Sequence, residues 1–316
     1  AVYSHRKNSV IVGRQNDPEV DIDLSFCRER KIIAKRVPTP GTVFGHSGYI
    51  IAGFYMPRNL LPESIGGAFS LVLSAFCREL EKKWGVTARY RPLNDVEVMI
   101  GGSWRKISPC SLTFFGESAC FRIGLTIKSP PMDLVEGALP PPPGKLSDKQ
   151  ARNLSERIGC LEEAAEREIS ISEAKDIYVT LAEKRFDARV EAGGISDVEM
   201  KYDRELIEKY DNDEWFYANT VSRRFRDIPS GSILKESSIK VPSGPLIRAR
   251  TLLKGGRIVD VSITGWFHGI SPLEATELIE KSLRDVPASE DQIRSRVRTA
   301  FDAHGIKVGN SGPEDI

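Results

Sequence analysis

The chain has 316 residues, of which 40% are hydrophobic and 28% charged, a composition typical of a globular protein. Its formal net charge of +1 gives no general attraction to nucleic acid or to an acidic membrane, so neither is expected as a partner. The longest apolar run, at 68–77, is too short to cross a bilayer, and no secretory signal is recognisable. The five cysteines form no C-x-x-C pair, which favours reduced thiols and a cytoplasmic location.

The first 130 residues are predicted to be rich in strands. Before residue 60 we expect three strands and a short helix, at 8–15, 23–32 (the helix), 31–37 and 42–57. The clearest helix covers 64–84, because its apolar side chains repeat at i, i+3, i+4 and i+7 and Gly85 follows it. Four more strands, separated by Gly and Pro turns, follow at 86–92, 95–100, 101–108 and 120–127.

The remainder of the chain divides at the proline-rich stretch 138–149, which favours an extended, stiff connector. A charged helical region follows to about residue 217, with helices expected at 147–168 and 170–190. After residue 227 the pattern indicates three strands with a Gly-Gly turn at 255–256, then helices at 272–286 and 289–304. We therefore predict an α+β protein with a large domain at 1–226 and a small α+β domain at 227–316.

Three features in the strand-rich region could carry chemistry. Arg36 stands at a Pro/Gly turn, where a guanidinium and backbone N–H groups can hold an anion together. Asn94 and Asp95 form a second turn, and Lys106 lies on a strand. Taken singly, each is more often a surface charge or an ordinary turn residue. The four histidines show no metal-binding spacing, and no catalytic triad, Walker or dinucleotide motif is present.

The order of these blocks is more informative than any one of them. The stretches are VIVGRQNDPEV (10–20), KRVPTPGTVFGHSG (35–48), RPLNDVEVMIGGSWRKIS (91–108) and PPGKLSDKQARNLSERIGCLEE (142–163). They closely resemble, in order, the G-x-x-Q-N-P, R-R-x-S-G-G-G-x-V-x-H-D, R-x-x-N-D, K-I-S-G and P-x-K-x-x-D-K motifs of lipoate-protein ligases. DNDEWFY (211–217) and the stretch 244–267 resemble later parts of the same biotin/lipoate ligase-like family.

This resemblance implies a mixed-sheet ligase domain with a small C-terminal α+β accessory domain. It also implies a two-step acyl transfer that uses ATP and Mg²⁺. A small carboxylic acid, lipoate or a related one, would attack the α-phosphate of ATP and form an acyl-adenylate. A lysine of a lipoyl-type carrier domain would then take the acyl group.

The resemblance also assigns residues. Lys106 would be the catalytic lysine that bridges the acid and the α-phosphate, Asp95 would hold Mg²⁺, and Arg36 would help to frame the acid. Lys145 would belong to a mobile loop that excludes water from the adenylate. The further contacts to substrate or acyl-adenylate would come from Thr39, Gly41, Val43, Phe44, Tyr49, Asn94, Ile107, Ser108 and Gly124.

The chain departs from the family pattern in its glycine-rich motif. Thr39-Pro40-Gly41 replaces three glycines, and Gly48-Tyr49 replaces Gly-Asn, so side-chain volume is added and an N–H donor is lost. The acid pocket is therefore expected to be reshaped. This leaves open a ligase for a different acid with a small-amine acceptor, or a non-catalytic paralogue. An octanoyltransferase would need a nucleophilic thiol, for which only Cys110 is close to Lys106.

Overall fold

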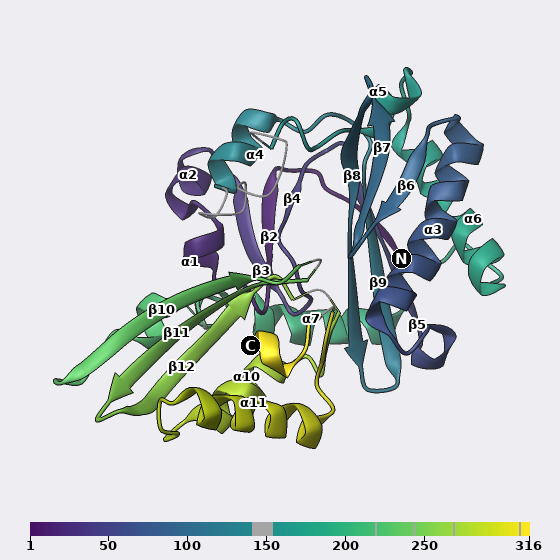
Figure 1. The fold of residues 1–316 in the computed structure, drawn as a ribbon. Helices are drawn as coiled ribbons and strands as arrows, with labels where there is room; N and C mark the ends of the chain where they lie inside the picture. Colours follow the sequence, from purple (N-terminus) through teal and green to yellow (C-terminus); the bar gives the residue numbers. More distant parts are fainter. Residues whose placement is uncertain (141–153, 219, 243, 268, 310) are drawn as a thin grey trace.

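The structure is a computed structural model that describes residues 1–140, 154–218, 220–242, 244–267, 269–309 and 311–316. Figure 1 shows a large and a small sheet side by side, with a third sheet and its helices at one end of the molecule. Among the described residues, no helix is both long and apolar enough to cross a membrane. The α+β fold class expected from the sequence is confirmed.

The large sheet has six antiparallel strands. In sheet order they are β1 (Val2–Ser4), β5 (Tyr49–Pro57), β9 (Ser118–Thr126), β8 (Ser103–Phe115), β7 (Asp95–Ile100) and β6 (Ala88–Arg91). One face packs against α3 (Ile65–Trp84) and α6 (Ile171–Phe186), and the largest hydrophobic core lies there. Alternate residues such as Leu112, Phe121 and Ile123 are fully buried in it. The opposite face, called the inner face below, is directed at the small sheet (Figure 1).

The two long helices that cover the large sheet begin at the serine caps that their sequences predict, and α3 also ends where predicted. The Ser64 hydroxyl accepts a bond from the N–H of Gly67 at 3.1 Å, and Gly85 ends α3 in the left-handed region at φ 69°. Ser170 caps α6 in the same way, through the N–H of Glu173 at 3.1 Å. The predicted helices at 64–84 and 170–190 are therefore confirmed, although α6 ends at Phe186.

The small sheet places β2 (Ser9–Gly13) between β3 (Ile33–Val37), which is parallel to it, and β4 (Val43–Gly45), which is antiparallel. The short helix α1 (Pro18–Asp21) follows β2, and α2 (Leu24–Glu29) and α4 (Met132–Ala138) supply residues to the core of this sheet. The prediction of one strand over 42–57 is wrong. A turn in which the N–H of Tyr49 donates to the carbonyl of His46 at 3.0 Å separates β4 from β5, and the two strands join different sheets.

The helix expected over 147–168 is also wrong where the structure describes it. Residues 154–160 form turns and a bridge, and only α5 (Leu161–Ala165) is helical. The reason is tertiary pairing: the N–H of Lys106 donates to the carbonyl of Arg157 at 2.7 Å, and the N–H of Gly159 donates to the carbonyl of Lys106 at 3.0 Å. Backbone bonds to β8 thus replace the helical ones.

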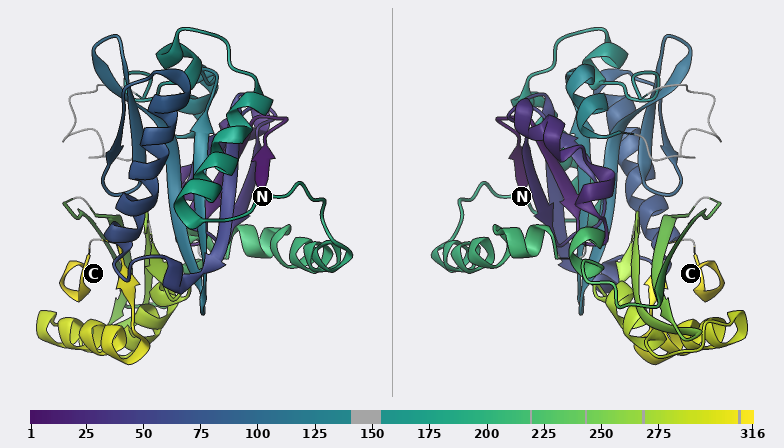
Figure 2. Two further views of the ribbon diagram at one scale, coloured as in Figure 1. Left: turned by 90° about the vertical axis from the view of Figure 1, so that its right-hand side faces the viewer. Right: turned by 90° about the vertical axis from the view of Figure 1, so that its left-hand side faces the viewer.

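The remaining elements before residue 226 are short or peripheral. They are η1 (Arg58–Leu60), α7 (Asp197–Tyr210), α8 (Asp213–Phe216) and α9 (Val221–Arg224). Figure 2 shows α7 standing away from the body of the molecule, and its side chains are exposed over almost the whole length. Helix α8 instead packs near the end of β3, as the contacts of Arg36 below show.

The C-terminal part has a sheet and a core of its own. Strands β10 (Ser232–Lys240), β11 (Leu246–Lys254) and β12 (Arg257–Gly265) form an antiparallel sheet, covered by α10 (Ala275–Leu283) and α11 (Glu290–His304). Short elements β13 (Ile270–Ser271), β14 (Lys307–Val308) and η2 (Pro313–Asp315) complete it. Gly255 and Gly256 have φ of 57° and 73°, which confirms the predicted two-residue hairpin turn.

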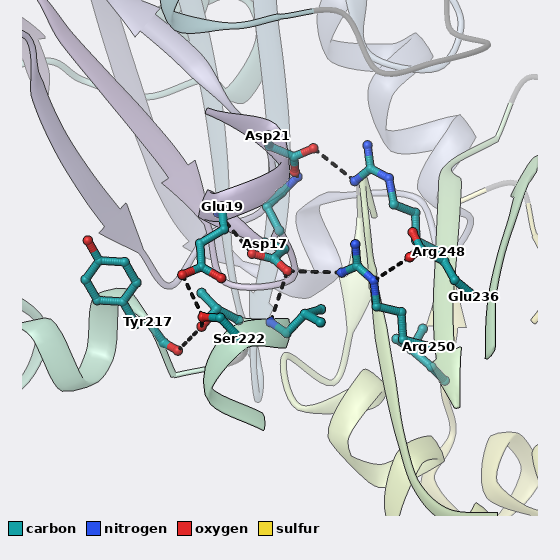
Figure 3. A network of polar contacts seen from close by, with 12 residues as sticks. Asp17, Glu19, Asp21, Tyr217, Ser222, Glu236, Arg248 and Arg250 are labelled. Atoms are coloured by element: carbon teal, nitrogen blue, oxygen red, sulfur yellow. Dashed lines mark hydrogen bonds and ion pairs between the residues drawn. The ribbon is translucent and has the colours of Figure 1, made fainter. Parts of the chain in front are cut away.

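Two buried ion pairs join this C-terminal sheet to the loop and helix that follow β2 (Figure 3). Arg248 contacts Asp21 at 2.9 Å and Arg250 contacts Asp17 at 3.2 Å, and both carboxylates are fully buried. The N–H of Gly265 also donates to the carbonyl of Gln15 at 2.8 Å. The C-terminal part is therefore fastened to the residues that immediately follow β2.

Replacement of Arg248 by Met should lower the free energy of unfolding by roughly 3–5 kcal/mol, because it leaves the buried charge of Asp21 without its cation. Urea unfolding measures this change. The double variant Asp21→Asn with Arg248→Met should recover part of the loss. Arg294→Met, which removes the exposed pair with Glu290, is the matched control and should change stability by about 0.5 kcal/mol or less. An equal loss in both single variants would contradict the assignment.

We propose that residues 1–226 and 227–316 form separate domains, since the segment 226–231 between α9 and β10 is exposed and the C-terminal core is distinct from the others. Limited proteolysis should therefore cut first within 226–231 and release a small C-terminal fragment. Mass spectrometry of the first products identifies the site. A first cut inside β11 or β12 would show that the C-terminal part is not an independently folded unit.

Candidate active site

The candidate catalytic residues lie on the inner face, at the end of β7 and on β8. In the pairing of these strands Asp95 is opposite Pro109 and Glu97 is opposite Lys106. A β-bulge shifts the register between Val96 and Glu97, so β8 carries one extra residue at this point. The bulge aims the two charged side chains at each other.

Lys106 and Asp95 form a close ion pair, with Nζ 2.5 Å from Oδ1. The Lys106 side chain is 30% exposed and that of Asp95 19%, so the pair borders solvent, and the Asp95 Oδ1 that faces Lys106 is itself buried. The backbone of Lys106 is fixed on both sides, by β7 and by the segment 157–159. A lysine held in this way presents a fixed positive charge on a rigid strand, which is what a site for a phosphate or carboxylate needs.

Arg157 adds a second cation, which the sequence patterns did not indicate. Burial lowers the pKa of its guanidinium, and the nearby Asp95 carboxylate opposes that effect. Because residue 157 was expected in a helix, its position beside Asp95 follows only from the pairing of 157–159 with β8. Lys106 and Arg157 together make this end of the inner face cationic.

Asn94 and Glu97 serve mainly to shape the site. The Asn94 amide donates to the carbonyl of Cys110 at 2.7 Å, and this bond ties the turn before β7 to β8. The Glu97 carboxylate is clamped by Arg89 at 2.7 Å and Arg91 at 2.9 Å. Asp95, by contrast, is the carboxylate at this end of the sheet that pairs with Lys106.

A magnesium ion fits this arrangement only as a partner of bound phosphates. Among the described residues, no group of three or more His, Cys, Asp or Glu is arranged to hold a metal by itself. Mg²⁺ commonly takes one or two carboxylates from the protein and the rest of its ligands from phosphates and water. Asp95, accessible and facing Lys106, can supply that single carboxylate.

The turn at 38–41 packs directly against the end of β2. A Cβ built on Gly13 would lie 2.6 Å from the carbonyl oxygen of Thr39 and 2.7 Å from the nitrogen of Gly41, so only glycine fits there. Gly41 itself has φ of 96°. The hydroxyls of Thr39 and Thr42 are buried, with no hydrogen-bond partner among the described residues. A ligand that reached this turn would find two unsatisfied hydroxyls.

Arg36 is buried and its guanidinium donates to backbone carbonyls. The acceptors are Trp215 at 3.1 Å, Phe216 at 3.3 Å, Asn16 at 3.4 Å and Arg14. The Trp215 indole N–H returns a bond to the carbonyl of Arg36 at 3.1 Å. Burial lowers the Arg36 pKa to about 10. Arg36 thus joins the loop after β2 to α8, and its predicted role in framing the acid stays a prediction.

The other residues that the resemblance assigns differ in how deeply they are buried. Tyr49, Phe44, Ile107, Ser108 and Gly124 are buried, whereas Val43 is half-buried on β4. The Ser108 hydroxyl donates to the carbonyl of Gly124, which links β8 to β9 close to Lys106. Lys145 lies outside the described residues. The assigned residues that are described therefore come from both sheets, which agrees with a site between them (Figure 1).

The five cysteines are unpaired and buried. Burial raises the pKa of the Cys110 thiol to about 12, so it stays protonated at neutral pH. A protonated, buried thiol is a poor nucleophile. This finding disfavours an acyl-thioester mechanism through Cys110.

Residues 1–181, more than half of the chain, match the model of the family described as the lipoyl protein ligase A/B catalytic domain. The chain belongs to this family. A search of curated proteins found no match to this chain. The sequence resemblance to lipoate-protein ligases is thus confirmed, and the Lys106–Asp95 pair lies within the matched lipoyl protein ligase region.

Solved structures show the same fold. The bipartite lipoate protein ligase of Thermoplasma acidophilum, solved in work on an archaeal lipoylation system with its E2 lipoyl domain, is 23% identical with a TM-score of 0.59, and the match covers 68% of this chain and 82% of that one. P. falciparum LipL1 in complex with lipoate is 13% identical, with a TM-score of 0.65 and coverage of 98% and 82%. A lipoate-protein ligase A bound with ATP is 21% identical, with a TM-score of 0.57 and coverage of 68% and 84%.

The turn between β4 and β5 contains a histidine that should make stability depend on pH. His46 is buried and its Nδ1 accepts a bond from the N–H of Gly48 at 3.2 Å. Burial, and to a smaller extent the neighbouring His5, lower its pKa to about 4 from the usual 6.5. The unfolded chain therefore binds a proton below about pH 6.5, whereas the folded one does so only near pH 4.

Stability contributed by neutral His46 should accordingly be lost as the pH falls from about 6.5 to 4, by about 3 kcal/mol in total. Urea unfolding of the wild type and of His46→Gln across this range measures the difference. The variant should lose about 2–3 kcal/mol less than the wild type between pH 7 and pH 4.5. His304→Gln, at an exposed position, should follow the wild type, and parallel curves for all three proteins would contradict the prediction.

Proposed function

We propose that this protein is an ATP-dependent adenylate-forming ligase. It activates lipoate or a related carboxylic acid as the acyl-adenylate and transfers the acyl group to a lysine of a lipoyl-type carrier domain. The observation that carries the proposal is the accessible Lys106–Asp95 pair on a rigid, bulged strand, with Arg157 beside it, in a chain of the lipoyl protein ligase family. Its five buried thiols suit a reducing compartment, and we propose that it acts in the cytoplasm.

In the first step an oxygen of the acid attacks the α-phosphorus of ATP, and the bond to the pyrophosphate oxygen breaks. This brings a carboxylate against a triphosphate, so fixed positive charge is needed where negative charge accumulates. Lys106, released from Asp95, would stabilise the oxygens shared by the acid and the α-phosphate. Arg157 would stabilise the departing negative charge, and Asp95 would hold the Mg²⁺ that neutralises the phosphates.

In the second step the neutral amine of the carrier lysine attacks the acyl carbon, and AMP leaves. The mixed anhydride is open to hydrolysis, so the turn at 38–41 and the segment 157–159 must shield it from water. The buried, unpartnered hydroxyls of Thr39 and Thr42 can bind polar atoms of the intermediate at that turn. Two structural relatives support the choice of partners: one was solved with lipoate, and the other was described together with an E2 lipoyl domain.

The non-catalytic alternative has less support. A paralogue that only bound its ligand would not need an accessible lysine held by strand pairing on both sides and paired with a carboxylate that can take Mg²⁺. A small-amine acceptor in place of a carrier lysine remains the second candidate for the transfer step, because the altered turn at Thr39-Pro40-Gly41 changes the shape of the site.

Lys106→Ala should reduce acid-dependent exchange of pyrophosphate into ATP by about 10²–10³-fold, the usual effect of removing one group that stabilises transition-state charge. The melting temperature should change little, since the Lys106 side chain is partly exposed. The assay uses a panel of carboxylic acids that includes lipoate, octanoate, biotin, benzoate and simple dicarboxylates.

Lys128→Ala is the matched control, because Lys128 also forms an ion pair, with Glu162 at 3.6 Å, and lies just beyond β9. Its exchange rate should equal that of the wild type. Normal exchange by Lys106→Ala, or unfolding of that variant, would overturn the assigned role of Lys106. A wild type that binds ATP but exchanges pyrophosphate with no acid would favour the non-catalytic alternative.

A further inference from the structure

Tyr49 covers Gly124 of β9 on the inner face, and β9 is the strand next to β8, which carries Lys106. A Cβ built on Gly124 would be 1.9 Å from the Tyr49 hydroxyl oxygen and 2.6 Å from the ring carbon that bears it. The phenol therefore lies directly over Gly124, in the space that any other residue at 124 would fill. The Tyr49 side chain is 2% exposed.

Gly124 lies in the same sheet as the Lys106–Asp95 pair, two strands away from Asp95. Asp95 of β7 is opposite Pro109 of β8, and the next residue of β8, Cys110, is opposite Ile123 of β9. The Ser108 hydroxyl of β8 also donates to the carbonyl of Gly124 on β9. Adjacent strands are about 4.8 Å apart, so Gly124 is roughly 10 Å from the end of β7. An acid whose carboxylate lies at Lys106 and whose chain runs over β9 meets the Tyr49 phenol there.

The Tyr49 ring is held in this position. Tyr49 is the first residue of β5, and the centroid of its ring is 5.5 Å from that of His5 and 6.3 Å from that of His46. Burial raises the pKa of the phenol well above its ordinary value, so the hydroxyl keeps its proton and can act as a donor. A long acyl chain would have to displace a close-packed aromatic side chain, which is unfavourable.

Arg122 makes the same end of the site polar. It is two residues before Gly124 on β9, on the same face, and its charge is close enough to the Tyr49 hydroxyl to affect the pKa of that group. Its Nε donates to the Ser111 hydroxyl at 3.3 Å. In the part of the chain that the structure describes, no carboxylate forms an ion pair with this half-buried guanidinium. An apolar chain end would desolvate it without compensation, whereas an anionic end would pair with it.

We propose that Tyr49 and Arg122 determine the acid specificity of this ligase, selecting a short dicarboxylic acid: one carboxylate is activated at Lys106, and the other binds Arg122 beside the Tyr49 hydroxyl. This inference rests on the proposed function for the activation step, and it narrows the substrate class. Arg122 acts on the far end of the acid and takes no part in adenylate formation.

The test compares length-matched acids in the exchange of pyrophosphate into ATP with Mg²⁺ present. The probes are glutarate and valerate, which have the same number of carbons, together with octanoate and lipoate. The wild type should use glutarate at least about 10-fold better than valerate, and octanoate and lipoate less well than glutarate. Either lipoate or octanoate as the best acid for the wild type would overturn the proposal while leaving the proposed ligase activity intact.

Two variants separate the role of Arg122 from that of Tyr49. Arg122→Gln should reduce the preference for glutarate over valerate to about 2-fold or less without lowering the rate with valerate, a change that a merely structural role would not produce. Tyr49→Gly should raise the rate with octanoate by about 10-fold or more relative to glutarate. An unchanged ratio in Arg122→Gln, or no gain with octanoate in a folded Tyr49→Gly, would overturn the inference.

Tyr55→Gly is the matched control for chain length, because Tyr55 is on the same strand and the same face but is 66% exposed, so its acid profile should equal that of the wild type. If Tyr49→Gly does not fold, Tyr49→Leu serves in its place, with the same expected gain.

A wild type that exchanges pyrophosphate with no acid would refute the proposed function, and acid binding then tests the inference separately. Glutarate alone should raise the melting temperature of the wild type and not that of Arg122→Gln. Equal shifts of the melting temperature in the two proteins, or no shift in the wild type, would overturn the inference.

Discussion

The burial of one face of the six-stranded sheet is the constraint on which the rest of this structure depends. Strands β5, β8 and β9 place every second side chain against α3 and α6, in a core with fully buried Phe, Leu and Ile residues. The alternate residues must then face the small sheet, whatever their polarity. Charged and small residues gather on that inner face, and the candidate site forms there because the other face has no room for it.

The small sheet is held in place by polar contacts more than by a large core. The guanidinium of Arg36 satisfies carbonyls on both sides of the loop after β2 and on α8. Asp17 and Asp21, a few residues further on, are neutralised by arginines of β11 (Figure 3). Elements that are far apart in the sequence thus meet at one short segment, residues 14–21.

The departures from the family motif have a structural counterpart. The backbone of residues 39–41 lies against Gly13 with Thr39 and Pro40 in place of glycines, and Tyr49 fills the space over Gly124. These changes do not touch the Lys106–Asp95 pair. In the proposed mechanism the Lys106–Asp95 pair and Tyr49 would thus act at separate places, so one chemistry could be combined with a different acid.

Local patterns in the sequence were enough to predict α3, α6, the Gly-Gly hairpin and the two C-terminal helices. Each of these depends on a cap, a turn residue or a period of apolar side chains within a few residues. The order of the motifs was enough to indicate the family, because motif spacing is a property of the sequence, and the catalytic role of Lys106 stays a prediction. The failures were at 42–57 and 154–160, where the local pattern was regular but other parts of the chain offered the backbone different partners.

By itself, then, the sequence determined α3, α6, the two C-terminal helices, the hairpin and the family, since the information for these lies within short segments or in their order. Only the tertiary structure decided that 42–57 divides between two sheets, that Arg157 stands beside Asp95, and that Tyr49 covers Gly124. The physical reason is the same in all three cases. Strand pairing and side-chain packing between distant segments determine which groups meet, and no local propensity carries that information.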